Sequence, residues 1–274
     1  MAESVTSSAD AKATDTKLLV VDVGNTQTHF GLFEQGGETI VAEWRFATVR
    51  ESTSDELGAA LANLLALRGF GFRDVGASIV SSTVPQLSEQ WRAMSASYLG
   101  HEMLVVGPAI KTGMPIRIDN PREVGADRLV NAVAAYERFK TTCVIVDFGT
   151  AVTYDAVSAD GEYLGGIITP GIEISLEALA ARAAKLPTVE MGEPRAVIGK
   201  STVEAIRSGV AYGFAGQVEG IVRRMREELD EELKVIATGG FSKVMFPFIR
   251  DSIDAVDEFL TLTGLRLIWL RNQR

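Results

Sequence analysis

The 274-residue sequence has little of several residue types on which particular classes of protein depend. Its one cysteine, Cys143, excludes a disulfide framework or a zinc-binding cysteine cluster and fits a reducing cytoplasm. Cys143 lies in an apolar run, so we interpret it as a buried strand residue. No run is long and apolar enough to span a membrane. No basic run stands out in a chain of net charge −9, so nucleic acid and anionic membranes are poor partners.

The composition is otherwise that of an ordinary soluble protein. Hydrophobic residues make up 46% and charged residues 23%, which is enough to bury a sizeable core. The length allows one large or two modest domains. Residues 1–16 are polar and lack the apolar segment of a signal peptide, so they are predicted to be a disordered tail.

The apolar run 18–21 predicts a buried strand that ends at Asp22. A glycine and two small polar residues follow, and 28–33 is typical of a returning strand, so 23–27 would form a tight turn. The backbone N–H groups and polar side chains of this turn could bind phosphate oxygens. Asp22 could hold a hydrated Mg²⁺. The alternative is an ordinary hairpin turn.

Residues 144–154 repeat this pattern. An apolar run leads to Asp147, one residue, a glycine, Thr150 and a new strand. Two Asp-x-Gly-[Asn/Thr] turns in the two halves of one chain indicate an internally duplicated fold. The phosphates of a nucleotide would then lie between two facing turns, which favours the phosphate-binding interpretation over the hairpin.

The remaining periodicity predicts an α/β fold with mixed sheets and helices packed against them. We expect two domains, residues 17–120 and 121–274, each opening with a three-strand meander. The predicted strands are 18–24, 28–34, 39–46, 75–81, 103–106, 142–147, 151–157, 163–169 and 234–237. The predicted helices are 54–67, about 84–98, one near 125 to 139, 172–184, one or two over 201–229, 241–250 and 260–270.

Residues 125–128, Gly-Ala-Asp-Arg, form a third candidate motif near the start of a predicted helix. A glycine inside a helix costs up to about 1 kcal/mol relative to alanine, which close approach of a ligand would explain. The side chains of Asp127 and Arg128 diverge by about a quarter turn or more on a helix. One could face a substrate hydroxyl and the other an anionic group. A solvated acid and base at a helix end is the alternative.

Three further features are weaker. Gly239 and Gly240 follow a predicted strand and precede a helix, where they would contact a nucleotide through the backbone or only turn the chain. Thr202 is either a helix cap, which the local sequence favours, or a hydroxyl facing the cleft. His29 is interpreted as a strand residue packed beside the site rather than a catalytic base.

The ordered motifs Asp-Val-Gly-Asn-Thr, Gly-Ala-Asp-Arg, Asp-Phe-Gly-Thr-Ala and Thr-Gly-Gly resemble those of type III pantothenate kinases, in the acetate/sugar kinase–Hsp70–actin superfamily. The resemblance runs from about Lys17 to the end of the chain and includes 260–265. It implies two duplicated ribonuclease-H-like domains with a cleft between them, as in actin-like ATPases. It also implies ATP-dependent phosphorylation of pantothenate to 4'-phosphopantothenate, the first step of coenzyme A synthesis. A homodimer is implied, whose interface forms part of the pantothenate site.

The resemblance also assigns roles to residues. Asp127 would be the general base, Asp147 would bind K⁺ or NH₄⁺, and Asp22 would hold Mg²⁺ in part. Many members have a tyrosine where this chain has Ile118, which puts one substrate contact in question. ATP would contact Asp22, Val23, Gly24, Asn25, Thr26, Gln27, Thr28, His29, Thr150, Gly239 and Gly240. Pantothenate would contact Gly125, Ala126, Asp127, Arg128 and Thr202.

Three other functions compete with this one. The first is a kinase of the same fold for a sugar or a carboxylate. The second is a non-catalytic regulator, because proteins that resemble this family, such as the Bvg accessory factor, have been tied to transcription. The pI of about 4.9 argues against direct DNA binding, and three retained aspartates, Asp22, Asp127 and Asp147, argue for chemistry. The third is an ATP-binding subunit of a larger assembly.

Overall fold

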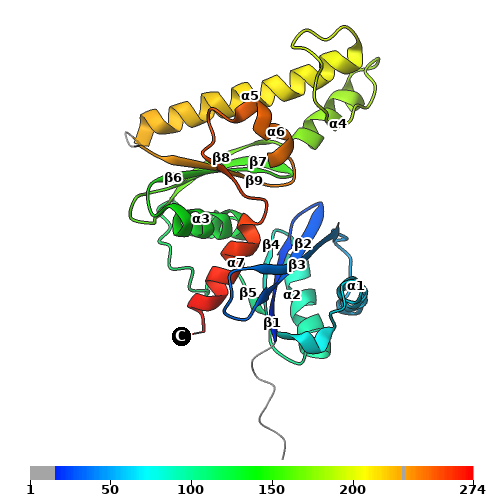
Figure 1. Cartoon of the computed structure of the whole chain (residues 1–274), viewed down its shortest axis with the longest axis vertical. Coiled ribbons are helices and arrows are strands. Elements are labelled where there is room, and N and C mark those ends of the chain that lie inside the picture. Colours follow the sequence, from blue (N-terminus) through cyan, green and yellow to red (C-terminus); the bar gives the residue numbers. More distant parts are fainter. Residues whose placement is uncertain (1–15, 230–231, 274) are drawn as a thin grey trace, which may run out of the picture.

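The computed structural model describes residues 16–229 and 232–273 (Figure 1). The predicted disordered tail therefore lies, except for Thr16, outside the described residues. Within the described residues, no helix is both long and apolar enough to cross a membrane.

Two five-stranded sheets share one topology, with strand orders β3-β2-β1-β4-β5 and β8-β7-β6-β9-β10. In each sheet the first three strands form an antiparallel meander, and the other two continue the sheet in parallel. This correspondence, strand for strand, confirms the predicted duplication. The strands are β1 (Lys17–Val23), β2 (Gln27–Glu34), β3 (Ile40–Ala47), β4 (Val75–Ser82), β5 (Leu104–Val105), β6 (Cys143–Phe148), β7 (Ala151–Val157), β8 (Tyr163–Pro170), β9 (Lys234–Thr238) and β10 (Ala255–Val256).

Within residues 16–229 and 232–273, seven α-helices surround and separate the sheets (Figure 1). α1 and α2 cover the outer face of the first sheet, and α5 and α6 lie over the outer face of the second. α3 and α7 lie between the sheets and pack on each other, α3 against β6 and β7 and α7 against β1 and β4. The helices are α1 (Ser54–Ala66), α2 (Pro85–Met94), α3 (Ala126–Phe139), α4 (Ile172–Arg182), α5 (Thr202–Leu229), α6 (Ser242–Ile249) and α7 (Leu260–Arg271).

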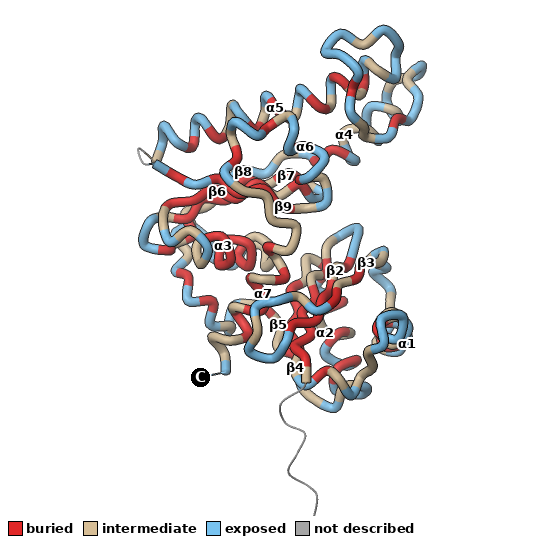
Figure 2. Tube along the Cα trace, viewed as in Figure 1, coloured by how far each residue is buried: buried red, intermediate tan, exposed pale blue. Residues whose placement is uncertain are grey.

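The first strand shows why the sheets are sandwiched in this way. Leu18 and Val20 face the core shared with α3 and α7, whereas Leu19 and Val21 face the core beneath α1 and α2. All four are buried, as expected for a strand covered on both faces (Figure 2). Because side chains alternate between the faces, Asp22 follows Val20 on the face toward α3 and α7.

Most predicted elements are present, and the structure adds two unpredicted 3-10 helices, Phe72–Asp74 and Pro121–Glu123. The predicted helix 84–98 is an α-helix only to Met94, and a π-helical turn, Ser95–Leu99, follows it. β10 was not predicted, because two residues carry no periodicity. The proposed division near residue 120 stays a prediction, since α7 packs on the first sheet although it follows the second in the chain.

Candidate active site

A cleft of about 580 Å³ lies between the sheets at the ends of β1 and β6. The turn after β1 and the turn after β6 line it from opposite sides, and the start of α3 lies between them. Its lining residues include Asp22, Gly24, Asn25, Thr26, Gln27, His29, Arg45, Asp127, Asp147, Thr150, Glu173, Gly239, Gly240, Glu258 and Thr261.

In both turns the glycine N–H donates to the carbonyl of the first residue of the returning strand, but the first turn is one residue longer. The Gly24 N–H donates to the Gln27 carbonyl at 3.0 Å, and the Gly149 N–H donates to the Ala151 carbonyl at 3.0 Å. A Cβ at Gly24 would lie 2.9 Å from the Gln27 carbonyl oxygen, so this turn closes only around glycine. Backbone N–H groups in such turns form anion-binding sites.

Three carboxylates converge on the cleft. The loss of hydration there raises the pKa of Asp22 to about 8, and repulsion from Asp127 and Asp147 contributes. The same loss raises the pKa of Asp147 to about 7, with repulsion from Asp127 and Asp155. Burial raises the pKa of Asp127, whereas hydrogen bonds from backbone N–H groups, that of Arg128 first, lower it. A bound cation would stabilise the ionised forms of these three carboxyls together.

Asp22 fits a partial Mg²⁺ ligand. Its Oδ1 atom is buried and has no hydrogen-bond partner among the described residues. Nowhere in the described chain do three or more His, Cys, Asp or Glu side chains stand close enough to hold a metal ion by themselves. Mg²⁺ is commonly bound through one or two carboxylates, with water and substrate phosphates completing its shell.

Asp147 is held by a hydrogen-bonded chain from two helices. The buried Asn131 donates from Nδ2 to Asp147 Oδ2 at 2.9 Å, and Thr261 Oγ1 donates to Asn131 Oδ1 at 2.7 Å. Sequence reasoning missed Asn131, although it lies four residues after Asp127 on α3 and hence on the same helix face. On the other side of Asp147, a Cβ at Gly239 (φ +89°) would overlap the Asp147 carboxylate.

The Gly-Ala-Asp-Arg segment begins α3 with Gly125 as N-cap. A Cβ at Gly125 would lie 2.5 Å from Asp127 Oδ1, so this glycine makes room for the Asp127 carboxylate rather than for a ligand alone. As predicted, the two charged side chains diverge. Asp127 lines the cleft, and Arg128 does not.

Arg128 pairs with Asp155, a fully buried carboxylate on β7. Arg128 Nε and Nη2 donate to Asp155 Oδ1 at 2.8 and 2.7 Å, and the Tyr163 hydroxyl donates to the same oxygen at 2.6 Å. A Cβ at Gly166 would come within 2.7 Å of Arg128 Nη2. Gly166 thus gives room to this ion pair, and Ile118 lies over the neighbouring Gly165.

The structure gathers most of the predicted residues and leaves some out. Asp22, Gly24, Asn25, Thr26, Gln27, His29, Asp127, Asp147, Thr150, Gly239 and Gly240 line the cleft. Val23 and Thr28 are buried, and Gly125, Ala126 and Arg128 lie just outside the lining. Thr202 is exposed and away from it, and the Ser201 hydroxyl caps the helix by accepting the Glu204 N–H at 3.3 Å. His29 packs in β2 and pairs with Glu43, as interpreted.

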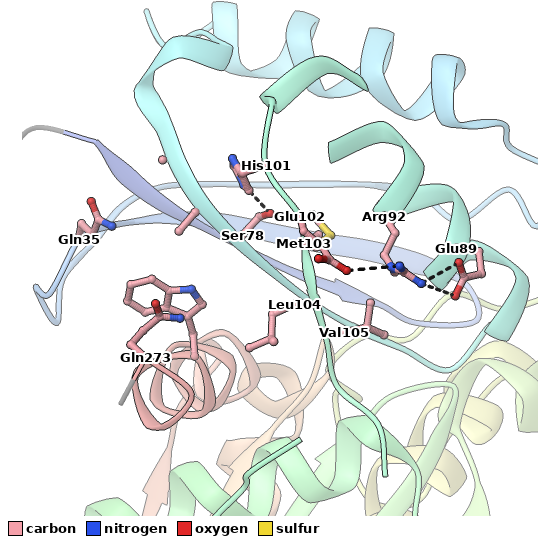
Figure 3. Close-up of a pocket in the computed structure, with 13 residues that line it drawn as sticks. Gln35, Ser78, Glu89, Arg92, His101, Glu102, Met103, Leu104, Val105 and Gln273 are labelled. Carbon is pink, nitrogen blue, oxygen red and sulfur yellow. Dashed lines mark hydrogen bonds and ion pairs between the residues drawn. The ribbon is translucent and has the colours of Figure 1, made fainter. Parts of the chain in front are cut away.

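A second pocket, of about 680 Å³, lies at the β4–β5 edge of the first sheet (Figure 3). Its charged groups are engaged with one another, because Arg92 pairs with Glu89 and Glu102. The His101 ring is hydrogen-bonded to the Ser78 hydroxyl at 2.8 Å. None of the predicted site residues lines this pocket, so we place the chemistry in the cleft.

The duplicated sheets and facing glycine turns define a fold class, that of two ribonuclease-H-like domains. Solved structures agree on this fold. A Campylobacter jejuni protein described as a Baf family transcriptional activator is 19% identical, with a TM-score of 0.54, and the match covers 93% of this chain and 98% of that one. A ROK family protein from Streptococcus pneumoniae is 10% identical, with a TM-score of 0.51, and the match covers 94% of this chain and 99% of that one.

The sequence comparisons are more specific than the comparison of folds. The sequence model of type III pantothenate kinase matches residues 18–224. The type III pantothenate kinases of Syntrophus aciditrophicus and Geobacter sulfurreducens are 51% and 49% identical, and each match covers 93% of this chain and 99% of the relative. The chain belongs to the type III pantothenate kinase family.

Proposed function

We propose that this enzyme transfers the γ-phosphoryl group of ATP to the primary hydroxyl of pantothenate, giving 4'-phosphopantothenate and ADP in the first step of coenzyme A synthesis. The observation that carries the proposal is the meeting of the two Asp-x-Gly turns beside Asp127. A triphosphate laid over both turns would present its γ-phosphorus near that carboxylate. Phosphoryl transfer needs mainly such positioning and charge neutralisation.

Asp127 would act as the general base. It would accept the proton of the pantothenate hydroxyl while the new O–P bond forms and the bond to the ADP oxygen breaks. Burial raises the pKa of this carboxyl, which brings it closer to the range where a base is effective at neutral pH.

Asp22 would hold Mg²⁺ through its unpartnered Oδ1, and the ion when bound would neutralise charge on the β- and γ-phosphates. Asp147, positioned by Asn131, would hold K⁺ or NH₄⁺. The turn residues 22–29, Thr150 and the backbone at Gly239 and Gly240 would contact ATP.

Pantothenate would lie at the start of α3, over Gly125, Ala126 and Asp127. Arg128, fixed against Asp155, would offer its remaining donors to an anionic oxygen of the substrate. Ile118, packed over Gly165, would give an apolar contact where relatives have a tyrosine hydroxyl.

We also propose a homodimer. β8, α4 and α5 expose apolar side chains, among them Ile168 (63%), Ile174 (43%) and Tyr212 (40%). A second copy packed against these elements would cover this exposed apolar surface. Thr202 is the first residue of α5 and so belongs to this face. Pairing of the face with a second copy would allow Thr202 to contact pantothenate bound to that copy. Sedimentation equilibrium tests the dimer.

We also propose that the enzyme acts in the cytoplasm, a reducing compartment that suits its single buried cysteine.

A coupled assay of ADP release with pantothenate, with and without K⁺, tests the function. Formation of phosphopantothenate is the expected result. A panel of sugars and carboxylates run alongside would reveal a different acceptor. Inactivity with every acceptor, in protein that still binds ATP, would favour a non-catalytic regulator or an ATP-binding subunit.

A further inference from the structure

One row of side chains crosses the first sheet at the cleft. Pairing places Ser81 of β4 opposite Asp22, Asp22 opposite His29 of β2, and His29 opposite Arg45 of β3. Residues directly opposite one another in a sheet project from the same face. Asp22, His29 and Arg45 all line the cleft. Arg45 was not among the predicted site residues.

The cleft is acidic, and Arg45 is the exception. Among the described residues that line it there are five carboxylates, Asp22, Asp127, Asp147, Glu173 and Glu258, and one arginine or lysine. Burial lowers the pKa of His29, and the Arg45 charge lowers it further. A nucleotide triphosphate entering this cleft would meet repulsion on most sides. Arg45 is the arginine that lines the cleft on the side of the first turn.

The Arg45 guanidinium is available for a ligand. Its recorded ion pair is with Glu43, whose Oε2 lies 4.0 Å from Arg45 Nε and only 2.8 Å from His29 Nε2. Glu43 is therefore committed mainly to His29. The Arg45 side chain keeps 36% of its surface exposed. A guanidinium presents several donors in a planar fork that suits phosphate oxygens.

The segment after Arg45 is fastened to the first turn. The Thr48 N–H donates to the Thr26 carbonyl at 2.9 Å, and Arg50 Nη2 donates to Asn25 Oδ1 at 3.2 Å. Arg45 thus belongs to a strand end whose position is set by the phosphate-binding turn itself.

The duplicate sheet carries no counterpart. There the matching row runs Thr238, Asp147, Thr153 and Ile168, so an isoleucine stands in the place of Arg45. The aspartate is repeated in both halves, but the cation is present only in the first. This asymmetry points to a task specific to the first turn.

We propose that Arg45 is a ligand of the nucleotide phosphates, contacting their oxygens from the first sheet. The proposal rests on the proposed function for the identity of the nucleotide. A charge-assisted hydrogen bond to phosphate contributes roughly 1.5–3 kcal/mol, which corresponds to about a ten- to hundredfold change in affinity.

The test compares Arg45→Gln, Arg45→Lys and the matched control Arg73→Gln. Arg73 is an exposed arginine of the short turn Phe72–Asp74, away from the cleft. We expect Arg45→Gln to weaken ATP binding about tenfold or more by calorimetry, with adenosine binding and the melting temperature unchanged. Arg45→Lys should show an intermediate loss, because lysine keeps the charge without the fork. Arg73→Gln should match the wild type.

Two results would overturn the proposal. One is unchanged ATP affinity in Arg45→Gln. The other is a raised KM for pantothenate with ATP affinity intact, which would assign Arg45 to the substrate carboxylate. Because ATP binding is measured without pantothenate, a wild type that fails to phosphorylate pantothenate would defeat the proposed function and leave this test standing. If Arg45→Gln has a lowered melting temperature, the ATP affinity of Arg45→Lys decides the outcome instead.

Discussion

Thr26 and Thr150 are 124 residues apart in the sequence, and their hydroxyl oxygens lie 3.1 Å apart across the cleft. Each belongs to a turn that directly follows a strand whose penultimate residue is an aspartate. The hydrogen bond therefore joins the equivalent turns of the two duplicated halves. In this arrangement a phosphate chain lying over the two turns would meet donors from both sheets at once.

The contact between Thr26 and Thr150 also explains the position of the Gly-Ala-Asp-Arg segment, residues 125–128. α3 lies between the sheets, so its N-terminus opens where the two turns meet. Asp127 is the side chain of that N-terminus that lines the cleft. The positive end of the helix dipole helps to keep this carboxylate ionised despite its burial.

Replacing Asp127 by asparagine tests the general base. The amide keeps the size of the side chain but accepts no proton at neutral pH. We expect kcat to fall by about 10²–10⁴-fold, with ATP affinity close to that of the wild type. Steady-state kinetics and ATP titration measure the two quantities. Turnover that survives the change would remove the assignment.

Exchange of K⁺ for Na⁺ tests the role of Asp147. If this carboxylate holds a monovalent cation, activity should drop in Na⁺ and return with K⁺ or NH₄⁺. Asp147→Asn should lower activity and abolish the difference between the two salts. An equal response of wild type and variant to K⁺ would place the cation elsewhere or exclude it.

The sequence was sufficient for the fold because its signals are local. The apolar run 18–21 is buried on both faces, and the repeated Asp-x-Gly turns stand at equivalent places in both sheets. Asp22 and Asp147 could be found for the same reason, since each directly follows such a run.

The partners of these residues could not be predicted, because strand register and helix packing bring them together. Arg45 enters the site only when His29 is known to lie opposite it. Thr261 reaches Asn131 across 130 residues, through the packing of α7 on α3. Thr202 matches a family position that contacts pantothenate, but it lies away from the cleft of the single chain.

The raised carboxylate pKa values predict how stability depends on pH without nucleotide. Between about pH 4 and pH 8 the folded state keeps protons on Asp22 and Asp147 that the unfolded chain releases, since their pKa values are raised to about 8 and about 7. The free energy of unfolding should therefore fall as pH rises through this range. Urea unfolding at pH 5, 6.5 and 8 measures the slope. Asp22→Asn should flatten it, and a slope that the variant leaves unaltered would contradict the electrostatic account.

A side chain at Gly166 is predicted to clash with the backbone and to displace Arg128, the arginine proposed to bind pantothenate. A Cβ there would overlap the Tyr154 carbonyl oxygen and lie 2.7 Å from Arg128 Nη2 and 2.9 Å from Asp155 Oδ1. Gly166→Ala should therefore destabilise the protein by about 1–3 kcal/mol, as overpacking does. It should also raise the KM for pantothenate more than that for ATP, because the displaced ion pair holds Arg128.

Gly213→Ala is the matched control for this substitution. Gly213 lies inside α5, and a Cβ there would meet no atom within 4 Å, so alanine should stabilise the helix by up to about 1 kcal/mol. Thermal unfolding and steady-state kinetics of both variants measure the contrast. Equal stability of the two variants would mean that the backbone of β8 accommodates a Cβ at Gly166 without loss of stability. An unchanged KM for pantothenate in Gly166→Ala would separate the Arg128–Asp155 pair from substrate binding.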